Sequence, residues 1–328
     1  MTALRGPLAA LPGSLAALPG PLATRRPLAV GIQLPEIEWE ARWPDLRALA
    51  LRAEDLGFDA VWYGDHLLYR RPGDDRARGP WEAWTILAAL AAVTSRVLLG
   101  PLVAATAFHS PAMLAKKAAT VDEISSGRLV LGLGAGWNET EFRAFGFPFD
   151  HRISRFEEAF TIVRTLLRDG AIDFTGTYFT ARDCELAPRP RPGGPPLMIG
   201  SSGARMLAIT IPYVDAWNAW FDAFGNRPAG VPALRDRVDA ACRDAGRDPA
   251  GVARTVAVQV RLPTGTGRIT GEAGRPPIPS VAGTPEEIAD VLRGFAAEGI
   301  SHVQLVVDPI TLASLDALAP VLEALDRG

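Results

Sequence analysis

Cysteine and lysine are scarce in this chain of 328 residues. The two cysteines, Cys184 and Cys242, are far apart and have no metal-like spacing. A disulfide framework is therefore not expected, and a reducing, cytoplasmic location fits best. The two lysines, Lys116 and Lys117, fall inside a predicted helix. This position argues against an aldolase, which would need a Schiff-base lysine at a strand end.

Long apolar runs and a strong net charge are also missing. No run could span a bilayer, so the sequence predicts no membrane insertion. A net charge of −3 and a pI near 5.9 give no electrostatic reason to expect nucleic acid or an anionic membrane as a partner. We expect a small-molecule substrate. Residues 1–26 superficially resemble a signal peptide, but prolines interrupt every possible hydrophobic segment. We expect a flexible N-terminal extension over 1–26 and a single domain over 27–328.

Motifs for metal and serine chemistry are absent as well. The four histidines, His66, His109, His151 and His302, are scattered and form no zinc-binding pattern. No Gly-x-Ser-x-Gly motif of a hydrolase occurs either. The sequence therefore predicts no metal ligand set.

What the chain does contain is a repeated strand–helix unit. The expected strands are 28–34, 59–63, 97–103, 128–133, 196–199, 214–218, 255–260 and 302–307. Amphipathic helices are expected at 44–56, 81–93, 111–124, 152–167 and 231–245, from 204 and 284 onward, and at the C-terminus. Eight such units predict an α/β fold, a (β/α)8 TIM barrel. A doubly wound sheet is the alternative, although no switch point in the strand order is evident.

The rhythm is interrupted over residues 171–196, between strands four and five. A small hairpin at 174–178 and a proline-rich loop at 188–196 indicate an insertion rather than a new domain. We expect this insertion and the loops 69–80 and 264–281 to build over the C-terminal mouth of the barrel.

Residues at the carboxyl ends of the strands converge in a barrel and can be considered together. They are rich in glycine, small residues, aromatic residues and amides, a composition that suits a flat heteroaromatic cofactor. The candidates are Gln33, Asp65, His66, Ala104, Ala105, Thr106, Gly134, Gly136, Trp137, Asn138, Gly200, Ser201, Ser202, Gly203, Trp217 and Asn218.

Three of these groups each have two interpretations. The segment 200–203 links a strand to a helix and could bind a phosphate, or it could supply a serine N-cap. The glycines at 132, 134 and 136 do not fit the dinucleotide-binding Gly-x-Gly-x-x-Gly pattern, because position 137 is tryptophan. They could instead allow a ligand or a neighbouring element to come close. Asp65 and His66 could be catalytic or an ordinary hydrogen-bonded pair.

The segment 127–142, Gly-Arg-Leu-Val-Leu-Gly-Leu-Gly-Ala-Gly-Trp-Asn-Glu-Thr-Glu-Phe, strongly resembles the strand-four signature of the bacterial luciferase-like monooxygenase superfamily. Segments 56–62, 145–148, 155–158, 174–178, 187–190 and 215–218 fit the same family in the same order. The resemblance extends from Leu28 to the C-terminus.

The resemblance implies a (β/α)8 barrel with an insertion, a homodimer, and reduced FMN or the deazaflavin coenzyme F-420 as cofactor. It implies a cofactor phosphate at 200–203 and a non-prolyl cis peptide at 104–105 or 105–106. In the deazaflavin branch an Asp-His pair lies beside the ring, which corresponds to Asp65 and His66. The sequence at 136–138 resembles that branch most. Sugar-phosphate dehydrogenases of the branch carry glutamate where Trp137 stands here, which argues against a sugar phosphate.

Our hypothesis from the sequence is an oxidoreductase that transfers a hydride between a small organic substrate and F-420. His66 would be the general acid/base or would polarise the ring, and Asp65 would orient it. The first alternative is an FMN-dependent monooxygenase that uses reduced flavin and O2. The second alternative is a flavin-binding protein without turnover. The loops 69–80, 181–196 and 264–280 are expected to form the substrate pocket.

Overall fold

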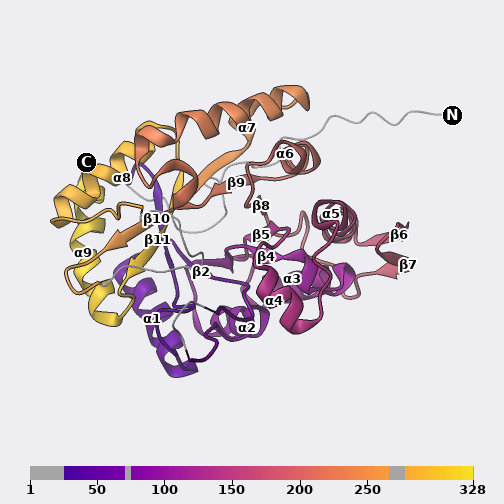
Figure 1. Ribbon diagram of the computed structural model, residues 1–328, viewed down its shortest axis with the longest axis horizontal. Coiled ribbons are helices and arrows are strands. Elements are labelled where there is room, and N and C mark those ends of the chain that lie inside the picture. Colours follow the sequence, from indigo (N-terminus) through magenta and orange to yellow (C-terminus); the bar gives the residue numbers. More distant parts are fainter. Residues whose placement is uncertain (1–25, 71–74, 266–277, 328) are drawn as a thin grey trace.

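The computed structural model describes residues 26–70, 75–265 and 278–327, and its centre is a parallel sheet of nine strands (Figure 1). Their order is β3-β2-β1-β11-β10-β9-β8-β5-β4. The strands are β1 (Ala29–Gln33), β2 (Ala60–Tyr63), β3 (Leu98–Pro101), β4 (Ala104–Ala105), β5 (Leu131–Gly134), β8 (Leu197–Ile199), β9 (Ala216–Ala219), β10 (Ala253–Arg261) and β11 (His302–Asp308).

The two ends of this sheet belong to one interrupted strand. β3 pairs with β2, and β4 pairs with β5. A parallel bridge between Leu99 and Leu129 joins β3 to the residues just before β5. It is flanked by hydrogen bonds from Leu99 N to Arg128 O (3.1 Å) and from Val130 N to Leu99 O (2.9 Å). The sheet is thereby closed, so the predicted barrel is confirmed and the doubly wound sheet is wrong.

Helices cover the outside of the barrel (Figure 1). They are α1 (Trp43–Leu56), α2 (Ala83–Val93), α3 (Pro111–Ile124), α4 (Glu139–Phe145), α5 (Arg152–Asp169), α6 (Ala204–Thr210), α7 (Pro232–Asp244), α8 (Pro285–Ala297) and α9 (Leu312–Arg327). The helix predicted from Thr284 begins with a capping box in which the Thr284 hydroxyl and the Glu287 carboxylate each accept a backbone N–H. Within the described residues, none of the helices has the length and apolarity needed to cross a membrane.

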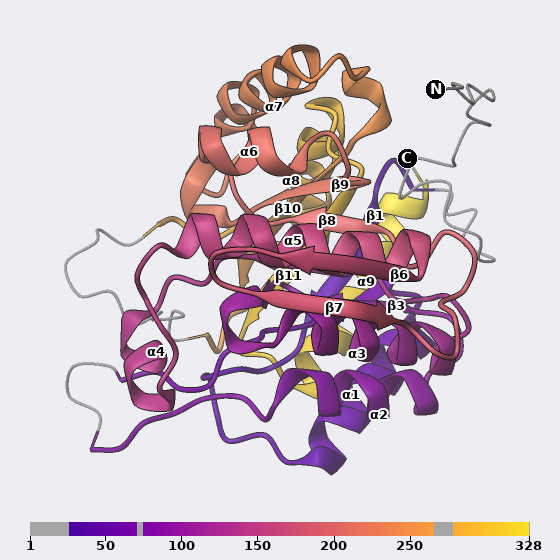
Figure 2. The ribbon, with the colours of Figure 1, turned by 90° about the vertical axis from the view of Figure 1, so that its right-hand side faces the viewer.

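The insertion between β5 and β8 contains the predicted hairpin, formed by antiparallel β6 (Ala171–Thr175) and β7 (Thr180–Glu185). The hairpin runs along the outside of α5 (Figure 2). Its turn is held there because the Glu158 carboxylate accepts the N–H groups of Thr177, Tyr178 and Phe179. The expectation that the hairpin covers the barrel mouth is therefore wrong.

Residues 1–25 of the predicted extension lie outside the described residues. Arg26 belongs to the fold, because its guanidinium pairs with Asp59 at 3.3 Å and with Asp326 at 2.6 Å. Of the loops predicted over the mouth, 71–74 and 266–277 also lie outside the described residues.

The barrel interior contains polar groups as well as apolar ones. Asn218 donates to Thr255 Oγ1 and Gln304 Oε1, both at 2.8 Å. His302 on β11 is fully buried beside the Trp62 ring, with ring centroids 5.5 Å apart. Desolvation lowers the pKa of His302 to about 3, so this imidazole is neutral in the folded protein.

Candidate active site

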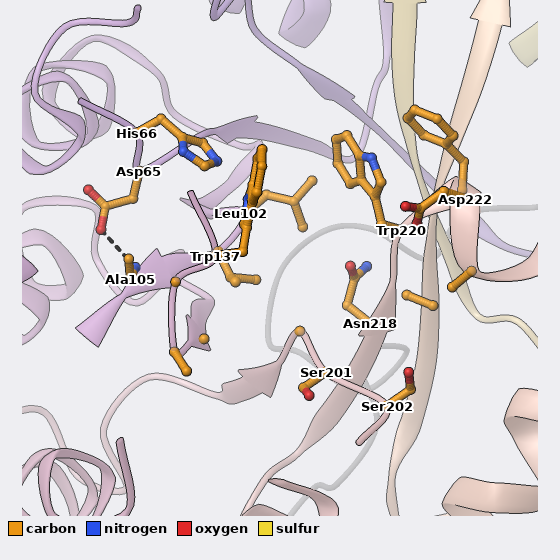
Figure 3. Close-up of a pocket in the computed structure, with 18 of the residues that line it drawn as sticks. Asp65, His66, Leu102, Ala105, Trp137, Ser201, Ser202, Asn218, Trp220 and Asp222 are labelled. Carbon is orange, nitrogen blue, oxygen red and sulfur yellow. Dashed lines mark hydrogen bonds between the residues drawn. The ribbon is translucent and has the colours of Figure 1, made fainter. Parts of the chain in front are cut away.

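A cavity of about 940 Å³ opens at the carboxyl ends of the strands. Eleven of the sixteen candidate residues line it: Asp65, His66, Ala105, Gly134, Gly136, Trp137, Gly200, Ser201, Ser202, Gly203 and Asn218. The cavity lies where a barrel collects its active-site residues, and segments from several strand ends form its walls (Figure 3).

Five candidates, Gln33, Ala104, Thr106, Asn138 and Trp217, do not line the cavity. Gln33 and Asn138 make contacts within the protein: Gln33 Nε2 donates to Glu36 Oε1 at 2.6 Å, and Asn138 Nδ2 donates to Leu68 O at 3.0 Å. Ala104 and Thr106 are buried in the barrel wall. These five residues therefore form no part of the cavity surface.

The strand-three exit explains three of the glycines. A Cβ on Gly132, Gly134 or Gly200 would lie within 2.8–2.9 Å of a Val103 methyl group, closer than such carbon atoms pack. The glycines therefore make room for Val103, which forms part of the cavity floor. The element that comes close is the exit of strand three, and neither a bound ring nor a helix is needed to explain these glycines.

The cis peptide bond was expected at 104–105 or 105–106, and this expectation is wrong. The non-prolyl cis bond joins Leu102 and Val103. The strand ends earlier than predicted, because β3 stops at Pro101 and residues 104–105 already pair with β5.

His66 is the imidazole that faces the cavity (Figure 3). Its Nδ1 lies 2.9 Å from Glu141 Oε1, and the other oxygen of Glu141 accepts the N–H of Leu67 at 2.8 Å. An ionised carboxylate only accepts hydrogen bonds, so Nδ1 carries the hydrogen and Nε2 is left for proton exchange. Burial alone would lower the pKa of His66, but the hydrogen bond to Glu141 and the charges of Glu36, Glu141 and Asp65 outweigh burial and raise it.

Asp65 does not orient His66, contrary to the prediction. Its Oδ2 accepts the backbone N–H of Ala105 at 2.9 Å (Figure 3). The same oxygen lies 2.9 Å from His109 Nε2. Successive side chains of an extended chain point to opposite sides, so the two neighbours reach different partners. Asp65 thereby fastens the strand-three exit to the strand-two exit.

An aromatic wall stands beside His66. The Tyr69 ring lies 4.8 Å and the Trp137 ring 5.7 Å from the imidazole, measured between centroids. Glu36, which the sequence analysis missed, is buried behind them, and its Oε2 is 3.4 Å from the Tyr69 hydroxyl. A methyl group on Gly64 would collide with Glu36 Oε1, so a larger residue there would displace the Glu36 carboxylate. This end of the cavity combines an imidazole, carboxylates and flat apolar surface.

The opposite end of the cavity is formed by the 200–203 segment (Figure 3). Trp217 Nε1 donates to Ser201 O at 2.8 Å and fixes the loop. The N-cap of α6 is Gly203, which has no side-chain cap, so the serine N-cap interpretation is wrong. Arg152 brings a guanidinium to the cavity wall while donating to Gly136 O at 2.7 Å. The hydroxyls of Ser201 and Ser202 at this end are suited to an anion.

Other cavity residues were missed by the sequence analysis. They include Glu36, Glu141, Arg152, Asp222 and Arg261. Glu36 and Arg261 could have been found, because they lie at or just after the ends of β1 and β10. Glu141 is one of two acidic residues on α4 and lies within the strand-four signature segment 127–142, but the sequence does not show that its carboxylate meets His66. Among the described residues, no group of three or more His, Cys, Asp or Glu side chains is arranged to hold a metal ion.

Several known proteins are similar to this chain in sequence. The pyrimidine monooxygenase RutA of Cronobacter sakazakii is 38% identical over 172 residues, which are 51% of this chain and 50% of that protein. The pyrimidine monooxygenase RutA of Stutzerimonas stutzeri is 36% identical over 210 residues, which are 61% of this chain and 56% of that protein. The chain thus spans about half the length of the curated relatives it matches.

Solved structures share the fold at lower sequence identity. An F420-dependent secondary alcohol dehydrogenase, in complex with an F420-acetone adduct, superposes with a TM-score of 0.77 at 21% identity and covers 91% of this chain and 99% of its own. The EDTA monooxygenase EmoA from Chelativorans superposes with a TM-score of 0.73 at 17% identity, with coverages of 93% and 94%. Residues 26–262 match the sequence pattern of the luciferase-like monooxygenases. The chain belongs to the luciferase-like monooxygenase family.

Proposed function

We propose that the chain is an oxidoreductase that transfers a hydride between a small organic substrate and the deazaflavin coenzyme F-420. The observation that carries the proposal is His66, an imidazole that faces the cavity, is hydrogen-bonded to a buried carboxylate and has a raised pKa. Hydride transfer at an alcohol or carbonyl carbon needs a partner for one proton, and such an imidazole can provide it.

The cavity residues fit a cofactor of this kind. A volume of about 940 Å³ is within the size range of small-molecule and cofactor sites. Ser201 and Ser202 would hold a phosphate, helped by the guanidinium of Arg152, and Val103, Ala105 and the strand-four glycines would support a flat ring. When bound, a deazaflavin supplies the hydride acceptor or donor.

The geometry of His66 indicates which ring nitrogen would exchange the proton of the substrate. With Nδ1–H directed to Glu141, the lone pair of Nε2 can take the hydroxyl proton of an alcohol substrate as the hydride leaves its carbon. In the opposite direction, the imidazolium returns the proton to the carbonyl oxygen. The aromatic side chains of Tyr69 and Trp137 line the same end of the cavity.

A flavin-dependent monooxygenase that uses O2 is the second candidate. The sequence relatives named pyrimidine monooxygenases favour it, at up to 38% identity over half of this chain. The two candidates differ in the cofactor and in the need for oxygen. A third outcome, cofactor binding without turnover, would correspond to a non-catalytic flavin-binding protein.

Cofactor binding separates these candidates. Purified protein would be titrated with F-420 and with FMN, and binding followed by absorbance and fluorescence. Alcohols, aldehydes and pyrimidines would then be tested with oxidised and reduced F-420 without oxygen, and with reduced FMN in its presence. We expect F-420 binding and oxygen-independent hydride transfer. Tight FMN binding without F-420 binding would refute the proposal.

His66 provides the direct test of mechanism. His66→Gln should lower kcat/KM by about 10²–10⁴-fold, the usual contribution of general acid–base catalysis, while F-420 binding persists. The matched control is His151→Gln, because His151 is exposed and does not line the cavity. Unchanged activity of His66→Gln would remove His66 from the mechanism.

The family resemblance also leads us to propose a homodimer. Sedimentation equilibrium of the purified full chain would test it, and a monomer across the concentration range would contradict it.

A further inference from the structure

We propose that Glu141 is a positioning residue that fixes the tautomer of His66 and holds its ring toward the cavity. The inference rests on the proposed acid/base function of His66. Glu141 lies 75 residues from His66 in the chain, on the short helix α4 that follows the strand-four exit.

Both oxygens of Glu141 are engaged with the strand-two exit. One oxygen is 2.9 Å from His66 Nδ1, and the other is 2.8 Å from Leu67 N. Glu141 is fully buried, and a buried carboxylate is costly unless hydrogen bonds compensate it. The two bonds therefore fix the direction of the carboxylate, and with it the hydrogen on Nδ1.

The helix that carries Glu141 is itself fastened to the barrel. Phe142 is fully buried and packs edge-to-face on Phe108, with centroids 5.0 Å apart. Asn138, the N-cap of α4, donates to Leu68 O at 3.0 Å. Three successive residues of the strand-two exit, 66–68, thus bind to α4, so the position of His66 is set by this helix.

Other charged groups near His66 are occupied elsewhere. Asp65 binds His109 and the N–H of Ala105. Glu36 accepts from Gln33 Nε2 and the Tyr69 hydroxyl. Both carboxylates act on the imidazole through their charge, whereas Glu141 is the one side chain among the described residues that is hydrogen-bonded to its ring.

The substitution Glu141→Gln reduces the number of hydrogen-bond acceptors while it changes the shape of the side chain little. Glutamine has one acceptor oxygen, but both Leu67 N–H and His66 Nδ1–H need an acceptor. If the oxygen stays with Leu67, the amide NH2 faces Nδ1, and the imidazole must move its hydrogen to Nε2. Loss of the negative charge also lowers the pKa of His66.

Nitrogen NMR of the cofactor-free full chain tests this directly. In the wild type we expect the His66 ring to be the Nδ1–H tautomer when neutral. In Glu141→Gln we expect the Nε2–H tautomer, or a mixture, and a titration midpoint at lower pH. Glu139→Gln, on an exposed residue of the same helix, is the matched control and should leave both signals unchanged. An unchanged His66 tautomer and midpoint in Glu141→Gln would overturn the inference.

Kinetics then separate this inference from the proposed function. Under the proposed function, Glu141→Gln lowers kcat/KM for hydride transfer by about 10²–10⁴-fold and moves the acidic limb of the pH profile to lower pH. Altered NMR signals in the variant, with no hydride transfer by the wild type, would overturn the function and leave the positioning intact. Far-UV circular dichroism and urea unfolding of each variant show whether the fold is retained. Should Glu141→Gln not fold, Glu141→Asp replaces it, because the shorter carboxylate cannot keep both bonds.

Discussion

The buried His302 should make the protein less stable in mild acid, by an amount that the structure allows us to calculate. This imidazole is fully buried, and its pKa is lowered to about 3 because burial disfavours the charged form. In the unfolded chain a histidine has a pKa of about 6.5. Between these two values the unfolded state binds a proton that the folded state does not.

The sign and size follow from proton linkage. The stability contribution is fully present above the unfolded pKa and is lost as the pH falls toward the folded pKa. Each pH unit in this window changes the free energy of unfolding by about 1.4 kcal/mol. The free energy of unfolding therefore falls by about 2 kcal/mol between pH 6.5 and pH 5. Asp122 acts in the opposite direction, because desolvation raises the pKa of its carboxyl to about 6. Only a comparison of variants therefore isolates His302.

The assay is urea unfolding of wild type and His302→Gln between pH 8 and pH 5, followed by far-UV circular dichroism. The substitution removes the titrating group, so the stability of the variant should fall less on acidification, by about 2 kcal/mol at pH 5. A constant offset between the variants, from altered packing, does not affect this difference. His151→Gln, an exposed control, should give a curve parallel to the wild type. Parallel curves for His302→Gln and wild type would refute a neutral, desolvated His302.

Three further substitutions test individual contacts. Gly134→Ala places a Cβ 2.8 Å from a Val103 methyl group and should cost about 1–3 kcal/mol in urea unfolding, with recovery in the double variant Val103→Ala/Gly134→Ala. No recovery would contradict the contact. Arg128→Lys should cost about 2–3 kcal/mol of unfolding free energy, because one ammonium cannot reach the four carbonyls and the hydroxyl that this guanidinium binds. A stability equal to wild type would mean that these bonds are weak. Asp65→Asn should destabilise the strand-three exit while leaving the His66 tautomer unchanged in nitrogen NMR. A changed tautomer would restore Asp65 as its orienting partner.

The sequence predicted the strand order and the location of the site because both depend on local signals. The spacing of apolar residues indicates strands and helices. Eight repeated strand–helix units are compatible with few folds. Parallel strands of a barrel share one carboxyl end, so Asp65, His66 and the 200–203 segment could be assigned to a single mouth before any contact was known. Eleven of the sixteen candidates line the cavity, so this rule located most of the cavity wall.

The errors concern side-chain direction and long-range pairing. Adjacency in the sequence suggested that Asp65 orients His66, yet adjacent residues point apart, and the partner of His66 is a glutamate 75 residues away. The hairpin of the insertion packs outside α5 because one carboxylate, Glu158, binds the amides of its turn.

The sequence by itself determined the repeating fold, the edge at which the site lies and the residue types that line it. Only the tertiary structure decided which carboxylate meets the imidazole and that Gly134 accommodates Val103, whereas Gly136 accommodates the ring of Phe142. The physical reason is the distance along the chain over which each interaction acts. Apolar periodicity and turn chemistry act over a few residues, whereas these contacts join segments brought together by closure of the barrel, and no local pattern encodes their partners.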